Sequence, residues 1–179
     1  MKVNSNTILK ILKVLTWAGF IGLCIKAGSI LFSFWVSMYR NNIAAKNLYM
    51  GLDLSQLKEH SSSAYSILVG CIILIIAIQA FLFFVLLQIF KHVNLGSPFH
   101  NNIRKLILNL SVLSFAIGLL SKLTVGYSER LISKAISFPH LYEHIGIGDS
   151  FIFFGGILFF ISMVFKKGIE LQTDNDLTI

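Results

Sequence analysis

Four long apolar stretches, separated by shorter polar segments, dominate the sequence. They cover approximately residues 14–38, 65–90, 106–126 and 148–166. A membrane-spanning helix needs about 20 predominantly apolar residues to cross about 30 Å of hydrocarbon. The second stretch contains no charged residue, and the fourth is long enough once its flanking turn is included. The pattern therefore predicts an all-α integral membrane four-helix bundle, with residues 1–179 forming a single membrane domain.

The composition agrees with a membrane protein. Hydrophobic residues make up 55% of the 179 residues and charged residues 13%, whereas a soluble domain has about 45–50% and about 25%. Cys24 and Cys71 both lie within apolar stretches, so they provide neither a disulfide framework nor a zinc-ligand spacing. The basic N-terminal segment and its apolar run lack a small-x-small cleavage site. We therefore expect an uncleaved first helix.

Lysine and arginine are unevenly distributed among the polar segments. Eight lie in the N-terminal segment, the second loop and the C-terminal flank, and five lie in the first and third loops. Because basic residues favour the cytoplasmic side of a membrane, we predict a multi-pass protein of the bacterial cytoplasmic (inner) membrane with both termini in the cytoplasm. Residues 167–179 then form a cytoplasmic tail. The net charge of +7 faces anionic lipid rather than nucleic acid.

One lysine, Lys26, lies near the middle of the first apolar stretch, roughly 13–18 Å from either end. Small and polar residues recur around it at three- and four-residue steps, which places them on one helix face; they are Gly19, Gly22, Lys26, Ser29, Ser33 and Ser37. A packing seam that shelters one lysine explains this stripe, and a water-accessible groove for an anionic ligand or lipid headgroup is the alternative. The candidate intramembrane polar site consists of Lys26, Ser29, Ser33, Gln79 and Asn109.

Two further features lie at the predicted outer face. Lys122 and Asp149 are expected at similar depth, so we predict a rim ion pair that contributes under about 1 kcal/mol when hydrated. Residues 140–144 match the His-x-x-Glu-His pattern of some zinc proteases, but no third ligand follows at a suitable position. We expect an amphipathic interfacial helix there instead, and no catalytic residue, metal, cofactor or enzymatic activity.

The second loop and the C-terminal tail form the candidate docking surface on the predicted cytoplasmic face. Pro98 interrupts the chain between the second and third apolar stretches, and Asn101 or Asn102 can cap the helix that follows. The tail is rich in carboxylates. Either a segment that docks a partner protein or a solvated helix end explains this composition. The candidate docking residues are Pro98, Phe99, Arg104, Lys105, Glu170, Gln172, Asn175, Asp176 and Leu177.

The C-terminal segment also carries a long motif. The last apolar stretch is followed by Phe165-Lys-Lys-Gly-Ile-Glu-Leu-Gln172 and then by Asn175-Asp-Leu-Thr-Ile179. This tail resembles that of a bacterial membrane-protein family called domain of unknown function 2975, with Asp174 standing where glutamate is commoner. The Pro98-Phe99 loop, followed by Asn102 and Arg104, resembles the family's middle hairpin. The resemblance implies a four-helix membrane protein that is often encoded beside a small helix-turn-helix regulator.

Two functional hypotheses follow from these observations. By family analogy, the leading one is a membrane-anchored regulatory partner of a small helix-turn-helix transcription factor. The alternative is a small transport or lipid-binding membrane module that uses the polar stripe around Lys26. The expected partners are membrane lipid and the regulator, with no direct contact to nucleic acid; homo-oligomer formation is left open.

Overall fold

The computed structural model describes residues 5–40, 42–92, 100–132, 138, 140–145 and 148–176. Its four long helices are α1 (Ser5–Tyr39), α3 (Ser62–His92), α4 (Asn101–Ile132) and α6 (Gly148–Asp176). Three short helices lie between them: the 3-10 helix η1 (Asn42–Lys46), α2 (Ser55–His60) and α5 (Leu141–Ile145). No strand occurs in these residues. The prediction of an all-α four-helix protein is confirmed.

The long helices extend beyond the apolar stretches that predict them. With 35 residues, α1 is about 52 Å long at about 1.5 Å per residue, whereas the hydrocarbon core of a bilayer is about 30 Å thick. By length and composition, all four helices can cross a membrane. The additional turns lie where polar residues continue a helix past its apolar segment.

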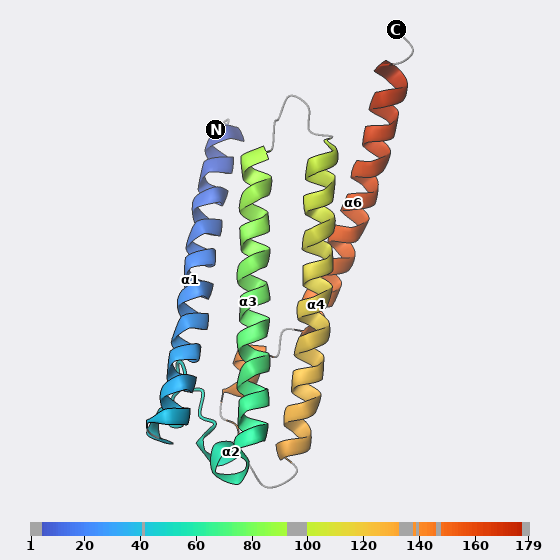
Figure 1. Cartoon of the computed structure of the whole chain (residues 1–179). Coiled ribbons are helices and arrows are strands. Elements are labelled where there is room, and N and C mark those ends of the chain that lie inside the picture. Colours follow the sequence, from blue (N-terminus) through green and yellow to red (C-terminus); the bar gives the residue numbers. More distant parts are fainter. Residues whose placement is uncertain are drawn as a thin grey trace.

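The four long helices form an open row. Contacts between the described residues join α1 to α3, α3 to α4, and α4 to α6, which crosses α4 obliquely (Figure 1). The outer helices α1 and α6 expose large apolar side chains such as Phe32 and Phe153. Because contiguous exposed apolar surface is unfavourable in water, this arrangement is compatible with helices that face lipid.

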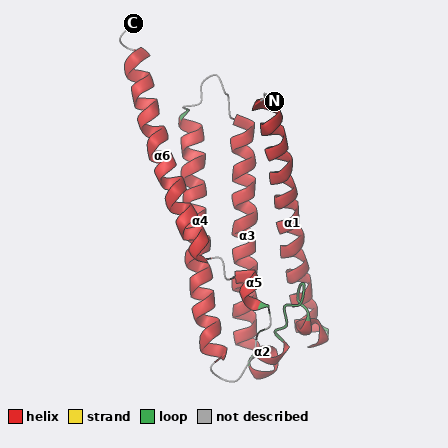
Figure 2. Ribbon diagram, turned by 180° about the vertical axis from the view of Figure 1, so that it is seen from behind, coloured by secondary structure: helices red, strands yellow, loops and turns green. Residues whose placement is uncertain are grey.

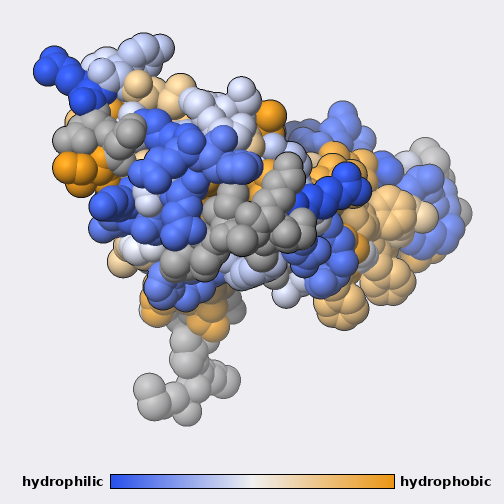
Figure 3. Space-filling view, turned by 90° about the horizontal axis from the view of Figure 1, so that it is seen from below, coloured by the Kyte–Doolittle hydropathy of each residue, from blue (hydrophilic) through white to orange (hydrophobic). Residues whose placement is uncertain are grey.

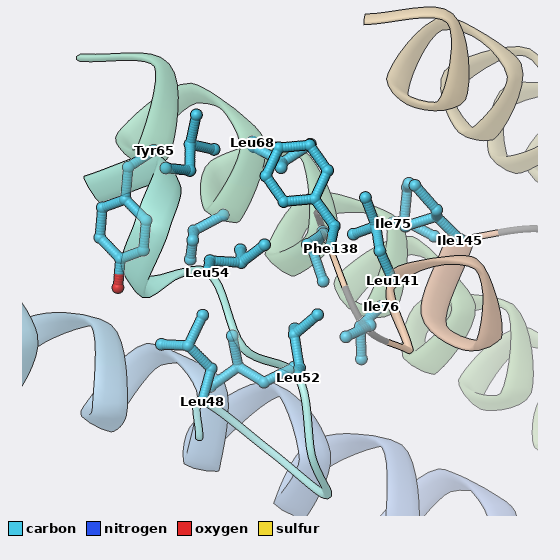
Figure 4. Packing of buried hydrophobic residues seen from close by; sticks show 14 of the residues in the cluster. Leu48, Leu52, Leu54, Tyr65, Leu68, Ile75, Ile76, Phe138, Leu141 and Ile145 are labelled. Atoms are coloured by element: carbon cyan, nitrogen blue, oxygen red, sulfur yellow. The ribbon is translucent and has the colours of Figure 1, made fainter. Parts of the chain in front are cut away.

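A small lobe packs against one end of the row. It consists of residues 42–60, together with Phe138 and α5, and it covers α3 (Figures 1 and 4). The buried apolar residues labelled in Figure 4 are Leu48, Leu52, Leu54, Tyr65, Leu68, Ile75, Ile76, Phe138, Leu141 and Ile145. This lobe supplies much of the apolar core, because the rest of the row packs only helix against helix.

A tight turn shapes the first part of the lobe. The Leu52 amide donates to the Tyr49 carbonyl oxygen at 3.0 Å, and the two central residues have positive φ, 45° at Met50 and 86° at Gly51. Two positive φ values define a type I′ turn, for which glycine is the preferred second residue. The side-chain oxygen of Asn47 accepts the Gly51 amide hydrogen at 3.1 Å and closes the turn.

The two ends of the row differ in their chemistry. At one end, α1 begins, α3 ends, α4 begins and α6 ends (Figures 1 and 2). We call this the basic end, because it carries Lys10, Lys13, Lys91, Arg104, Lys105, Lys166 and Lys167. The opposite, lobe end is seen face-on in Figure 3, where hydrophilic residues gather on the exposed face. The common location of the start of α1 and the end of α6 agrees with four membrane crossings.

Candidate functional site

The predicted polar stripe on α1 contacts α3 at both of its ends. At the start of the stripe, a Cβ atom at Gly19 would overlap Cε1 of Phe83, so the ring occupies the space that glycine leaves. Near the end of α1, Ser37 Oγ donates to the Phe34 carbonyl oxygen at 2.7 Å and lies 2.6 Å from the Tyr65 hydroxyl. Since the serine has one hydroxyl hydrogen, the tyrosine is the donor. Both ends of the stripe therefore serve helix packing.

The middle of the stripe contains Lys26, Ser29 and Ser33, all half-buried. Of the remaining residues of the predicted intramembrane site, Gln79 is buried on α3, and Asn109 is exposed on α4, which packs against α3 and α6. Within the described residues, no hydrogen bond joins Lys26 to the other four. A ligand-binding role for this set stays a prediction.

A rim ion pair connects α4 to the beginning of α6. Lys122 Nζ lies 2.6 Å from Asp149 Oδ1, which confirms the predicted pairing. The pair borders a cavity of about 290 Å³ that is also lined by Ser121, Glu129 and Tyr142. The Oγ atom of Ser121 is buried and has no hydrogen-bond partner among the described residues. This polar cavity lies beside the lobe, at the start of α6.

The His-x-x-Glu-His segment is divided between two environments. His140 Nδ1 lies 2.8 Å from Glu143 Oε1 on the exposed surface of the lobe. His144 is buried against the ring of Tyr49, at a centroid distance of 6.2 Å, and neither of its ring nitrogens has a hydrogen-bond partner in the described part of the chain. No cluster of three metal-ligating side chains occurs within those same residues. The expected helix is present as the five-residue α5, and its location at a membrane interface stays a prediction.

A second stripe of small and hydroxyl residues, on α4, is absent from the sequence predictions. It surrounds Gly118, and its buried hydroxyl residues are Ser111, Ser114, Ser121, Thr124 and Ser128. Ser111 Oγ donates to the Gly155 carbonyl oxygen at 2.8 Å, and Gly118 allows the backbones of α4 and α6 to approach closely. The three- and four-residue spacing that marks the α1 stripe is also present here, so the sequence contained this signal.

At the basic end, α6 continues well beyond its apolar part. It remains helical past Lys166 and Lys167 to Asp176, and Figures 1 and 2 show it extending past the other long helices. Glu170 lies 3.1 Å from Lys167 Nζ and 4.0 Å from Lys166 Nζ. Glu170 and Gln172 are exposed. The side chains of Asn175 and Asp176, and all of Leu177, lie outside the described residues.

The second loop contributes two described residues to the predicted docking surface. Arg104 is half-buried near the start of α4, and Lys105 is exposed and lines a cavity of about 260 Å³ together with Gln88 and His92. The other two predicted loop residues, Pro98 and Phe99, lie outside the described residues. A docking role for these four residues stays a prediction.

The fold and these sites define an all-α protein whose four apolar helices are compatible with a membrane location. The family model described as "Protein of unknown function (DUF2975)" matches residues 50–179. Because the match covers most of the chain, the chain belongs to this family, and the predicted family is confirmed. No curated protein matches the chain, and no solved structure matches it.

Proposed function

We propose that this chain is a non-catalytic membrane anchor that holds a small helix-turn-helix regulator through residues 168–176 of α6, the α6 extension. The observation that carries the proposal is the projection of this helical segment beyond the other long helices (Figure 1). The proposal places the chain in the bacterial inner membrane with both termini in the cytoplasm.

The charge distribution supports this orientation. The basic end holds seven described lysines and arginines from α1, α3, α4 and α6. The lobe end holds fewer: Arg40, Lys46, Lys58 and Arg130, besides Lys122 of the rim ion pair. Because lysine and arginine are retained on the cytoplasmic side, the α6 extension and its family motif would then face the compartment where DNA-binding proteins occur.

The α6 extension has side chains suited to a basic protein partner. Glu170 and Asp174 are exposed carboxylates, and Leu171 is an exposed apolar residue between them. Its nine residues reach about 13 Å beyond Lys167 at about 1.5 Å per residue. An acidic helix can attract the basic surface that a regulator uses for DNA and can compete with phosphate for it. The anchor would thereby withhold the regulator from DNA.

Affinity purification from native membranes tests the proposal. The compared chains are the intact protein, a chain truncated after Lys167, and the charge-reversed variant Glu170→Lys/Asp174→Lys. A matched control, Glu59→Lys/Glu129→Lys, reverses two exposed carboxylates at the lobe end. We expect the intact chain and the control to retain a helix-turn-helix protein, and the other two chains to lose it.

Two further results decide the matter. The retained regulator should bind its DNA after release and fail to bind it in the complex, because the acidic helix occupies the same surface. The proposal is wrong if the truncated chain recovers the same proteins as the intact chain, or if no DNA-binding protein is recovered with either.

A further inference from the structure

Positive charge at the basic end is unevenly neutralised. The sequence has no aspartate or glutamate before Asp53 and none between Glu59 and Glu129. Consequently α1 and α3 have no carboxylate of their own near Lys13 and Lys91. Within the described residues, neither lysine forms an ion pair. Positive charge on these two helices therefore lacks an internal counter-charge.

Both lysines line one cavity. It has a volume of about 340 Å³ and lies along the contact between α1 and α3 at the basic end. Its apolar lining includes Trp17 and Leu87. Trp17 lies four residues after Lys13, and Leu87 lies four residues before Lys91. Since the two helices are antiparallel, each lysine stands about one turn closer to the basic end than its apolar neighbour.

Aromatic rings extend the apolar part of this cavity across the two helices. Trp17 meets Phe20 edge to face at a centroid distance of 5.8 Å, and Phe20 lies 6.2 Å from Phe84, which also lines the cavity. Phe81 stacks on Phe84 at 6.1 Å. Trp17, Phe81 and Phe84 are all exposed, with Trp17 at 47%, so these rings are accessible from outside the row. The cavity thus has ammonium groups near the basic end and accessible apolar rings about one helical turn farther from that end.

We propose that this cavity binds the headgroup of an anionic phospholipid. The lipid phosphate pairs with the ammonium groups of Lys13 and Lys91, and the first part of an acyl chain lies over Trp17 and Phe84. A soluble anion can pair only with the two lysines, whereas a lipid can pair with the lysines and also place its acyl chain on the aromatic rings. Basic pockets between membrane helices favour anionic headgroups for this reason. The site is separate from the α6 extension and goes beyond the proposed docking function.

Tryptophan fluorescence provides the test. The chain has two tryptophans, so Trp35→Phe leaves Trp17 as the only reporter. This variant is reconstituted into phosphatidylcholine vesicles that contain equal mole fractions of acyl-dibrominated phosphatidylglycerol or acyl-dibrominated phosphatidylcholine. Bromine quenches tryptophan only at short range. We expect stronger quenching by the brominated anionic lipid, and no such preference in the Trp17→Phe variant, which reports from Trp35.

Two double lysine variants test which lysines produce the preference for the anionic lipid. Lys13→Gln/Lys91→Gln, in the Trp35→Phe background, should lower the relative affinity for phosphatidylglycerol by about fivefold for each lysine, which corresponds to about 1 kcal/mol per basic residue near an anionic surface. Lys166→Gln/Lys167→Gln removes the same charge from the same end but outside the cavity, and it should keep the preference. Circular dichroism establishes that each variant retains its helical content.

Three results would overturn the inference. The first is equal quenching by the two brominated lipids in the Trp35→Phe protein, a comparison that needs no lysine substitution. The second is an equal loss of preference in both lysine pairs, which would assign the effect to general surface charge. The third is relief of quenching by millimolar glycerol phosphate, which would identify a soluble phosphate as the occupant.

Discussion

The close contact between α4 and α6 leads us to expect opposite effects of alanine at two glycines, Gly118 and Gly156. A Cβ atom at Gly118 would lie 2.5 Å from Cγ1 of Ile152 and 2.8 Å from the carbonyl oxygen of Gly148. The second contact is with the backbone, so a side-chain rearrangement cannot relieve it and the helices must move apart. Gly156, on α6, has no atom within 4 Å of the corresponding position. Alanine should therefore be excluded at position 118 and accommodated at position 156.

The expected magnitudes follow from two opposing effects. Overpacking a close contact costs about 1–3 kcal/mol, while replacing glycine by alanine within a helix gains up to about 1 kcal/mol. Gly118→Ala should lower the free energy of unfolding by up to about 2 kcal/mol, because a clash with the backbone has a cost near the upper end of that range. Gly156→Ala has only the favourable effect and should raise it by up to about 1 kcal/mol.

Unfolding by sodium dodecyl sulfate in detergent micelles, followed by circular dichroism, measures both effects under the same conditions. We expect the unfolding midpoint of Gly118→Ala to fall and that of Gly156→Ala to stay equal or rise. Gly155→Ala provides an intermediate case, because its Cβ would lie 3.2 Å from the Phe115 ring and the Ser111 carbonyl oxygen. Equal midpoints for the variants at positions 118 and 156 would refute the close approach of α4 and α6.

Two further substitutions test the stripe on α1, with the same unfolding assay. Tyr65→Phe removes the 2.6 Å hydrogen bond to buried Ser37 and should lower the free energy of unfolding by about 0.5–1.5 kcal/mol; an unchanged midpoint would show that this bond does not hold α1 against α3. Lys26→Met removes a half-buried ammonium group with no hydrogen bond to the rest of the predicted site, so the midpoint should stay equal or rise, because the desolvation cost disappears. A stable Lys26→Met protein that loses binding or flux of an anion would instead favour the transport hypothesis.

The number and type of the long helices could be predicted from sequence because the bilayer thickness fixes the length of an apolar stretch. Their ends could not, since polar residues such as Ser5 and Gln172 continue a helix in water without a hydropathy signal. The lobe was also beyond this approach. Leu48 and Phe138 lie in separate short segments, and only the fold brings them into one buried apolar cluster.

For the candidate sites, the sequence predicted the position of a residue along its helix axis but not the rotation of the helix about that axis. Lys122 and Asp149 were paired correctly, because helix ends fix their depth and the residues carry opposite charge. Depth alone did not determine how each helix is rotated, which separates buried Gln79 from exposed Asn109. The α4 stripe around Gly118 has the same spacing as the α1 stripe, but it contains no charged residue to draw attention to it.

Charged side chains are paired differently at the two ends of the row. This difference distinguishes the proposed lipid site from the proposed docking function of the α6 extension. At the lobe end, Lys122 pairs with Asp149 across two helices. At the basic end, Glu170 lies close to Lys166 and Lys167 on its own helix. Lys13 and Lys91 have no ion-pair partner in the described residues. Because unneutralised ammonium groups attract anions most strongly where water is scarce, the α1–α3 contact should take up lipid phosphate. Lys166 and Lys167 are instead close to Glu170, so they attract lipid phosphate less strongly, and the acidic α6 extension remains accessible to a protein.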